Sequence, residues 1–163
     1  MYLLSVKYSE NPAIVDDDIS AFLSCYNWSF FKNYVCRSDS KHKIVKLHKI
    51  VWQYYHGKIP EGYEVDHKDR NTLNNQIKNL RLATKKQNVQ NRGKQKNNTS
   101  GYIGVGKCQM SGVIYWRARI VDNNGKRKSR CFPFTVEGLE EAAKWYDKKA
   151  LELRGEFAVL NFN

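Results

Sequence analysis

The segment from Val65 to Asn91 concentrates side chains that could together hydrolyse a phosphodiester bond. Asp66 and His67 are adjacent in it, and the amides Asn79 and Asn88 follow. Such hydrolysis needs an oxygen ligand for a hard cation, a base whose pKa lies near neutrality, and a group that orients this base. Carboxylate, imidazole and amide side chains meet these three needs.

Each of these residue types also has a plain structural explanation. An isolated histidine is most often a structural group, and pairs of asparagines mostly mark turns. His48 stands where a helix is expected, so a structural or phosphate-contacting role is the more common one, and His42 and His56 have no identifiable partners. We therefore leave these three histidines outside the candidate catalytic set.

The local pattern predicts the elements that must position Asp66 and His67. Apolar residues at helical spacing predict a helix over 46–55, which Gly57 and Pro60 end. Short apolar segments at 62–66 and 79–83 predict two strands joined by a loop rich in turn-forming residues, and Thr84 is a typical N-cap for a helix running to about 91. Residues 1–45 alternate short strands with one helical turn at 19–25, and form a strand-rich extension of the same domain.

The charge of the chain is localised. Its 28 Lys and Arg and 16 Asp and Glu leave a net charge of +12, and the stretch 85–130 holds twelve basic residues and one acidic residue. This distribution indicates a nucleic-acid partner. Membrane-surface binding would need a basic amphipathic helix, which this stretch lacks. Without an apolar run of spanning length or a signal peptide, we expect a cytoplasmic protein with reduced cysteines.

A second domain is predicted after residue 100. The segment 92–100 has almost no apolar residue and reads as an extended basic linker. Strands are expected over 102–107, 113–121 and 127–134, the last two joined by the hairpin sequence Asp122-Asn123-Asn124-Gly125, followed by a helix that Thr135 caps and Gly155 ends. The fold class is therefore α+β, with a small three-stranded antiparallel sheet packed on one helix in residues 101–163.

The continuous stretch LHKIVWQYYHGKIPEGYEVDHKDRNTLNNQIKNLRLATKKQNVQN, residues 47–91, resembles the HNH nucleases of the phage and intron homing endonuclease branch. The resemblance implies a β-β-α metal fold over 46–91, in which Asp66 and Asn88 bind the cation, His67 is the general base, and Asn79 orients that base by a direct hydrogen bond. Asn88 replaces the last histidine of the family name. An amide is a weaker ligand than imidazole, so we expect Mg²⁺, with Mn²⁺ as a substitute, and no zinc.

Residues 100–162 resemble the ethylene-response-factor (AP-two) DNA-binding domain of plants. The resemblance rests on Gly101-Tyr102-Ile103-Gly104-Val105, on Glu141-Ala142-Ala143-Lys144-Trp145-Tyr146-Asp147 and on Leu160-Asn161-Phe162. It implies that the sheet enters the major groove. Strand alternation places Arg117 and Arg119 on one face, where Lys128 and Arg130 are expected to join them, and arginine can read guanine or hold phosphate. Departures from the plant pattern at Arg119 and Arg130 leave the target sequence open.

These expectations combine into a site-selective, metal-dependent endonuclease that acts on double-stranded DNA as a monomer. A single active site per chain favours nicking of one strand, and dimerisation or successive visits to both strands would instead give a double-strand break. A phage- or intron-encoded homing endonuclease acting inside its host cell is the expected biological setting, and a non-catalytic DNA-binding regulator is the alternative. An RNA-binding module is less favoured because the sheet presents basic rather than stacking aromatic residues. Arg81 is expected either at a phosphate or in an ion pair. The predicted DNA contacts are Arg81, Arg92, Lys94, Lys96, Lys107, Arg117, Arg119, Lys126, Lys128 and Arg130.

Overall fold

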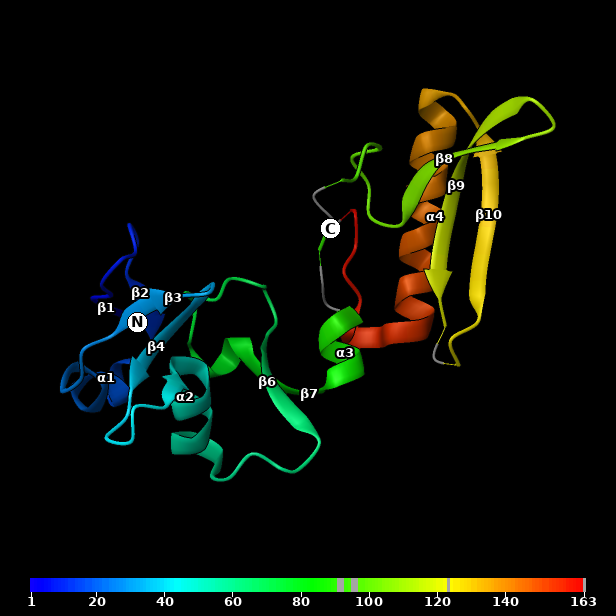
Figure 1. The fold of residues 1–163 in the computed structure, drawn as a ribbon. Helices are drawn as coiled ribbons and strands as arrows, with labels where there is room; N and C mark the ends of the chain where they lie inside the picture. Colours follow the sequence, from blue (N-terminus) through cyan, green and yellow to red (C-terminus); the bar gives the residue numbers. More distant parts are fainter. Residues whose placement is uncertain (91–92, 95–96, 123, 163) are drawn as a thin grey trace. The chain divides into compact units, whose positions relative to one another are not determined.

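The chain folds as two compact units, Met1–Asn88 and Val89–Asn163 (Figure 1). The structure, a computed structural model, describes all residues from 1 to 163 except 91–92, 95–96, 123 and 163. Helices and small antiparallel sheets make up both units, in agreement with the α+β class. No helix formed by the described residues has the length and apolar character that crossing a membrane requires.

The first unit begins with small sheets and two helices. Strand β1 pairs with β2, and β4 is the centre of a three-stranded sheet in the order β3-β4-β5. The helices bury apolar side chains at helical spacing, with Ile19 and Leu23 from α1 and Leu47 and Val51 from α2. The element bounds are β1 Tyr2–Leu4, β2 Ala13–Val15, α1 Asp17–Ser24, β3 Ser29–Phe31, β4 Tyr34–Ser38, β5 Ile44–Lys46 and α2 Leu47–His56.

A two-stranded ribbon and most of a short helix complete the first unit. Strand β6 (Tyr63–His67) pairs antiparallel with β7 (Leu80–Thr84), and α3 (Lys85–Gln90) follows directly. Thr84 and Gln87 bond each other reciprocally at the start of α3: the Gln87 amide N–H donates to Thr84 Oγ1 at 3.3 Å, and Gln87 Oε1 accepts from the Thr84 amide at 2.8 Å. This capping box ends the strand and begins the helix, which gives the predicted strand, loop, strand and helix order.

The core of the first unit joins the ribbon to the N-terminal elements. Val65 of β6 and Leu80 of β7 belong to the same buried cluster as Val15 of β2 and the apolar faces of α1 and α2. Trp28 is 2% exposed, and its indole N–H donates to the carbonyl of Leu23 at 2.9 Å. The residues before 46 are therefore packed into the core that supports the ribbon.

The second unit is a three-stranded antiparallel sheet covered on one face by a long helix (Figure 1). Strand β9 (Val113–Val121) lies between β8 (Val105–Met110) and β10 (Arg127–Pro133), and α4 spans Val136–Arg154. Alternate side chains of β9 are buried against α4, namely Trp116, Ala118 and Ile120. The helix contributes small residues at this contact, which lets it approach the sheet closely.

Both ends of α4 have specific caps. Thr135 is the N-cap, and its hydroxyl accepts a hydrogen bond from the amide of Gly138 at 3.0 Å. Gly155 at the C-terminal end has a φ of 53°, a conformation that glycine adopts without strain. The sequence predicted both positions.

Candidate active site and DNA-binding surface

Strand β6 presents Asp66 and His67 on opposite faces of the ribbon, because adjacent strand residues alternate in direction. Asp66 is 8% exposed and His67 is 4% exposed. Arg81 lies directly opposite Asp66 on β7, and its Nε and Nη2 atoms each donate to Asp66 Oδ2 at 3.1 Å. Of the two expectations for Arg81, the ion pair is therefore the one found.

The imidazole of His67 is held between polar and aromatic neighbours. Its Nε2 lies 3.3 Å from Oδ1 of Asn75, and its ring packs edge-on against His48 with centroids 5.0 Å apart. Burial lowers the pKa of His67, while the hydrogen bond to Asn75 and the nearby Asp69 carboxylate partly oppose this shift. A lowered pKa leaves the ring neutral at physiological pH, as a general base requires.

Asn79 occupies a different position from the one expected. Its amide nitrogen donates to Asp69 Oδ1 at 2.9 Å and to the Asn74 carbonyl at 2.7 Å, and its Oδ1 accepts from the Asp69 amide at 3.1 Å. Among the described residues, Asn79 makes no hydrogen bond to His67, so the expected direct contact is wrong. The side-chain amide of Asn79 is thus fully used in hydrogen bonds within the loop between β6 and β7. These bonds bring the earlier part of the loop back to Asn79.

Asn88 of α3 comes to the face of the ribbon that carries Asp66. Its Nδ2 donates to Glu64 Oε2 at 2.7 Å, and Glu64 precedes Asp66 by two residues, so both carboxylates share one face of β6. The amide oxygen of Asn88 is then turned away from Glu64. A carboxylate and an amide oxygen form a hard donor set, which suits Mg²⁺ or Mn²⁺ better than zinc. The two residues fit a cation of this class.

The loop between β6 and β7 is tied to the N-terminal part of the unit. The Ile14 amide donates to the Leu73 carbonyl at 2.8 Å, and the Asn75 amide donates to the Ile14 carbonyl at 2.7 Å. Asp16 Oδ2 accepts from the Ile77 amide at 2.7 Å, where the 3-10 turn η1 (Ile77–Asn79) begins. Asn75 and Asp16 were missed from the sequence, because an asparagine-rich segment and an acidic run both read as ordinary turns.

His48 of α2 is a buried neighbour of the site. It is 3% exposed and lies between the ring of Tyr34, at a centroid distance of 5.3 Å, and the ring of His67. Burial, followed by the nearby His67 and lysines, lowers the pKa of His48 to about 2. His48 is therefore a neutral packing group beside His67, as one of the sequence alternatives had it.

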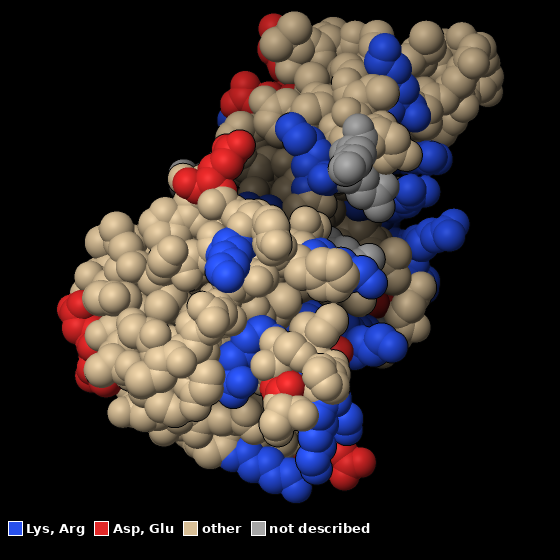
Figure 2. Space-filling model, turned by 60° about the vertical axis from the view of Figure 1, so that its left-hand side comes forward, with Lys and Arg blue, Asp and Glu red and all other residues tan. Residues whose placement is uncertain are grey.

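Lys and Arg recur over much of the face drawn in Figure 2, where Asp and Glu gather in fewer places. In the second unit, the strand register decides which basic side chains share a face. Residues directly opposite each other in paired strands point to the same side of the sheet. Arg119 pairs with Ser129 and Val121 pairs with Arg127, so Arg127 joins Arg117 and Arg119 on the face away from α4.

Lys128 and Arg130 do not lie on that face, which corrects the expectation. They pair with Ile120 and Ala118, two residues buried against α4, so their side chains project to the helix side of β10. The guanidinium of Arg130 lies over the Phe132 ring at 5.2 Å on the same side. The prediction failed because β9 and β10 pair one residue away from the register that it assumed. A shift of one residue moves every side chain of a strand to the other face.

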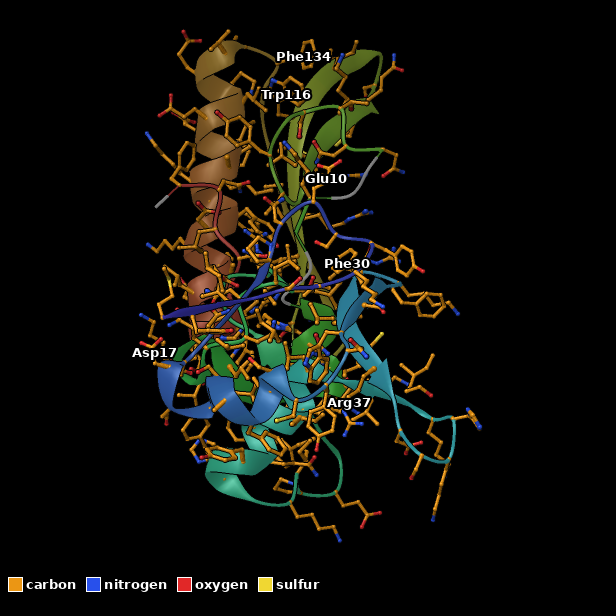
Figure 3. All side chains as sticks on the ribbon, turned by 90° about the vertical axis from the view of Figure 1, so that its left-hand side faces the viewer. Glu10, Asp17, Phe30, Arg37, Trp116 and Phe134 are labelled. Carbon is orange, nitrogen blue, oxygen red and sulfur yellow. The ribbon has the colours of Figure 1, made fainter. Side chains whose placement is uncertain are left out.

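Lys107 also lies on the helix side of the sheet. It pairs with Trp116, and its Nζ lies 5.1 Å from the centre of the Phe134 ring. The rings of Phe134 and Trp116 lie beside each other, with centroids 4.6 Å apart (Figure 3). Lys94 and Lys126 are exposed, Lys94 donating to the Gly101 carbonyl at 3.1 Å and Lys126 lying in the turn between β9 and β10. Arg92 and Lys96, predicted to contact DNA, lie outside the described residues.

Known proteins resemble this chain along most of its length. Protein 3.8 of Escherichia phage T7 is 36% identical over 117 residues, which cover 72% of this chain and 91% of the relative. The uncharacterized HNH endonuclease L560 of Acanthamoeba polyphaga mimivirus is 35% identical over 150 residues, covering 91% and 74%. DNA endonuclease I-HmuI of Bacillus phage SP01 is 30% identical over 115 residues, covering 71% and 63%.

The residues that match a known protein family include those of the candidate site. No solved structure matches the chain. The sequence pattern of the family described as HNH endonuclease matches residues 45–90, which run from β5 to α3 and include Asp66, His67, Asn79 and Asn88. Together with the extent of similarity to the mimivirus HNH endonuclease, this match shows that the chain belongs to the HNH endonuclease family.

Proposed function

We propose that the chain is a site-selective DNA endonuclease that hydrolyses phosphodiester bonds with a single divalent cation, Mg²⁺ or Mn²⁺, and His67 as the general base. The observation that carries this proposal is the arrangement on β6, where a buried His67 with its Nε2 3.3 Å from Asn75 Oδ1 directly follows Asp66, and Asn88 lies on the face of Asp66. Membership of the HNH endonuclease family and the similarity to DNA endonuclease I-HmuI support DNA as the substrate.

The side chains divide the work of hydrolysis between them. Neutral His67 accepts a proton from a water molecule, and the resulting hydroxide attacks phosphorus in line with the leaving 3′-oxygen. Asp66 and Asn88 would hold the cation through their oxygens. The bound cation would stabilise the charge that develops on the phosphate and on the leaving group. Arg81 holds the Asp66 carboxylate in one orientation through two hydrogen bonds.

The second unit is proposed to select the DNA site. Arg117, Arg119 and Arg127 share the exposed face of its sheet, and the described residues of that face include no carboxylate. Such a face can hold phosphates and read guanine edges in the major groove. The similarity of residues 100–162 to AP-two domains supports the same use of the sheet.

We propose further that the protein acts as a monomer and nicks one strand, since one chain carries one such site. We propose a homing endonuclease of a mobile element that acts inside the host cell, a setting that the similarity to phage proteins and to a prophage-derived putative HNH homing endonuclease of Bacillus subtilis supports. A non-catalytic DNA-binding regulator is the second candidate. The observation in its favour is that Arg81 already neutralises Asp66 in this structure.

A cleavage assay separates the two candidates. Supercoiled plasmid carrying the DNA that flanks the gene is incubated with the native protein, His67→Ala or His42→Ala, in Mg²⁺ or in EDTA. We expect nicking in Mg²⁺ by the native protein and by His42→Ala, an exposed histidine remote in sequence from the site. Nicking should disappear in EDTA and in His67→Ala while DNA binding persists. Binding without cleavage in Mg²⁺ and in Mn²⁺ would instead favour the regulator.

A further inference from the structure

We propose that Asn75 is the positioning residue of His67, a role that rests on the proposed function of His67 as the base. Asn75 is 1% exposed, and its Oδ1 lies 3.3 Å from His67 Nε2. Both partners are buried, so water does not compete for this hydrogen bond. Asn75 lies eight residues after His67, in the loop between β6 and β7.

The orientation of the Asn75 amide is set by its other end. Its Nδ2 donates to the Thr72 carbonyl at 3.1 Å, so the nitrogen faces Thr72 and the oxygen faces His67. An amide oxygen can only accept, so Nε2 of His67 must carry the hydrogen. In a neutral imidazole the lone pair then belongs to Nδ1. Asn75 therefore selects the tautomer and fixes the plane of the ring.

The backbone around Asn75 is held from two sides. Its amide N–H donates to the Ile14 carbonyl of β2 at 2.7 Å. The carbonyl of the preceding residue, Asn74, accepts from Asn79 Nδ2 at 2.7 Å. Asn79 thus acts on His67 through the loop and through Asn75, which explains how a residue without a hydrogen bond to the base can still influence it.

A loop-stabilising role is the competing explanation, and two substitutions distinguish it from positioning. Asn75→Leu has similar size but neither donor nor acceptor, whereas Asn75→Asp keeps an acceptor oxygen for His67 Nε2. A carboxylate facing the Thr72 carbonyl would be at least as harmful to the loop as leucine. If Asn75 only stabilised the loop, Asn75→Asp would therefore lose as much of the cleavage rate as Asn75→Leu.

The cleavage rate at saturating DNA and Mg²⁺ is measured together with DNA affinity and thermal stability. We expect Asn75→Leu to lower the rate about 10- to 100-fold, the effect typical of losing an orienting partner, at nearly unchanged affinity. Asn75→Asp should recover a large part of this loss. Equal losses in the two variants, or a native rate in a folded Asn75→Leu, would overturn the proposal.

A second measurement is independent of cleavage. Long-range ¹H–¹⁵N correlation spectra of the native protein at pH 7.5 report which ring nitrogen of each histidine carries hydrogen, and His67→Gln assigns the His67 signals. We expect the hydrogen on Nε2 in the native protein and a mixture of tautomers in Asn75→Leu. Hydrogen on Nδ1 in the native protein would overturn the proposal. If the native protein cleaves no DNA but shows the Nε2–H tautomer, the proposed endonuclease function is rejected, whereas the orientation of His67 by Asn75 is retained.

Discussion

Arg81 directs two hydrogen bonds, from Nε and Nη2, to the same Oδ2 atom of Asp66 across the paired strands β6 and β7. The side chains of both residues are about one-tenth exposed, at 9% and 10%. Removing one partner of a buried pair leaves a charge in a poorly solvated position. This arrangement makes the stability of the site depend on Arg81.

We predict that Arg81→Leu lowers the free energy of unfolding by about 3–5 kcal/mol, as expected for breaking a buried pair. Urea unfolding monitored by fluorescence measures the change. Lys144→Ala, which breaks the exposed pair with Glu140, is the control and should cost at most about 1 kcal/mol. Mg²⁺ should restore part of the stability of Arg81→Leu, because a cation at Asp66 replaces the lost positive charge. A variant indifferent to Mg²⁺ would argue against a cation site there.

Acid should destabilise the first unit through His48. Its pKa is about 2 in the folded chain and near 6.5 when unfolded, so below pH 6.5 the unfolded chain takes up a proton that the folded chain refuses. The contribution of His48 to the free energy of unfolding is therefore complete above pH 6.5, and it falls by up to about 1.4 kcal/mol for each pH unit below that value. Unfolding free energies between pH 4.5 and 7.5 measure this slope. His48→Phe should flatten it, and the exposed-residue variant His42→Phe should not.

The pH profile of cleavage should extend into mildly acidic solution. Because burial lowers the pKa of His67, its neutral form persists below pH 6.5, and the rate should fall only when pH drops through the lowered pKa. Single-turnover rates at saturating Mg²⁺ between pH 5 and 8 test this expectation. A rate that already declines between pH 8 and 7 would mean that another group controls the reaction.

Basic residues on the two faces of the second unit's sheet should differ in their effect on DNA binding. Arg119→Ala should weaken binding by about 1–3 kcal/mol if the side chain reads a base. If it holds a phosphate, the slope of the logarithm of the binding constant against the logarithm of the salt concentration should fall by about one. Arg130→Ala removes the same charge from the helix side and is the matched control. Titrations of labelled duplex at several salt concentrations distinguish these outcomes. Equal effects of both variants would contradict the use of one face.

Gly104 should tolerate no side chain. A Cβ atom there would lie 2.2 Å from the ring of Tyr146, and the residue has a φ of +72°. We predict that Gly104→Ala lowers the free energy of unfolding by about 2–4 kcal/mol, combining overpacking with backbone strain. Gly106→Ala is the control, because a Cβ at Gly106 has no heavy atom within 4 Å. Thermal unfolding of the two variants compares them, and similar melting temperatures would contradict the packing described here.

Local patterns predicted the elements well where one short signal decided the structure. The Thr84 and Thr135 caps, the hairpin after Val121 and the apolar spacing of α2 are signals of this kind. Their effect is confined to a few neighbouring residues, so the sequence alone is sufficient to predict them. The α+β character of the chain followed from the same signals.

Contacts between distant segments could not be predicted in the same way. The placement of Arg130 depends on a pairing register that no single strand specifies. Asn75 depends on Ile14, more than fifty residues earlier in the chain. An asparagine that orients a base and one that merely turns the chain have the same local sequence signature.

The hydrogen bonds between Ile14 and the loop at Leu73 and Asn75 also limit how the nuclease can be divided. The segment 45–90 contains every residue of the family pattern, yet it lacks the strand that anchors the loop opposite His67. Moving residues 45–90 into another protein would transfer Asp66 and His67 without the hydrogen bonds from β2 that hold the loop opposite His67. A transferable nuclease unit of this chain therefore has to include β2 (Ala13–Val15) in addition to that segment.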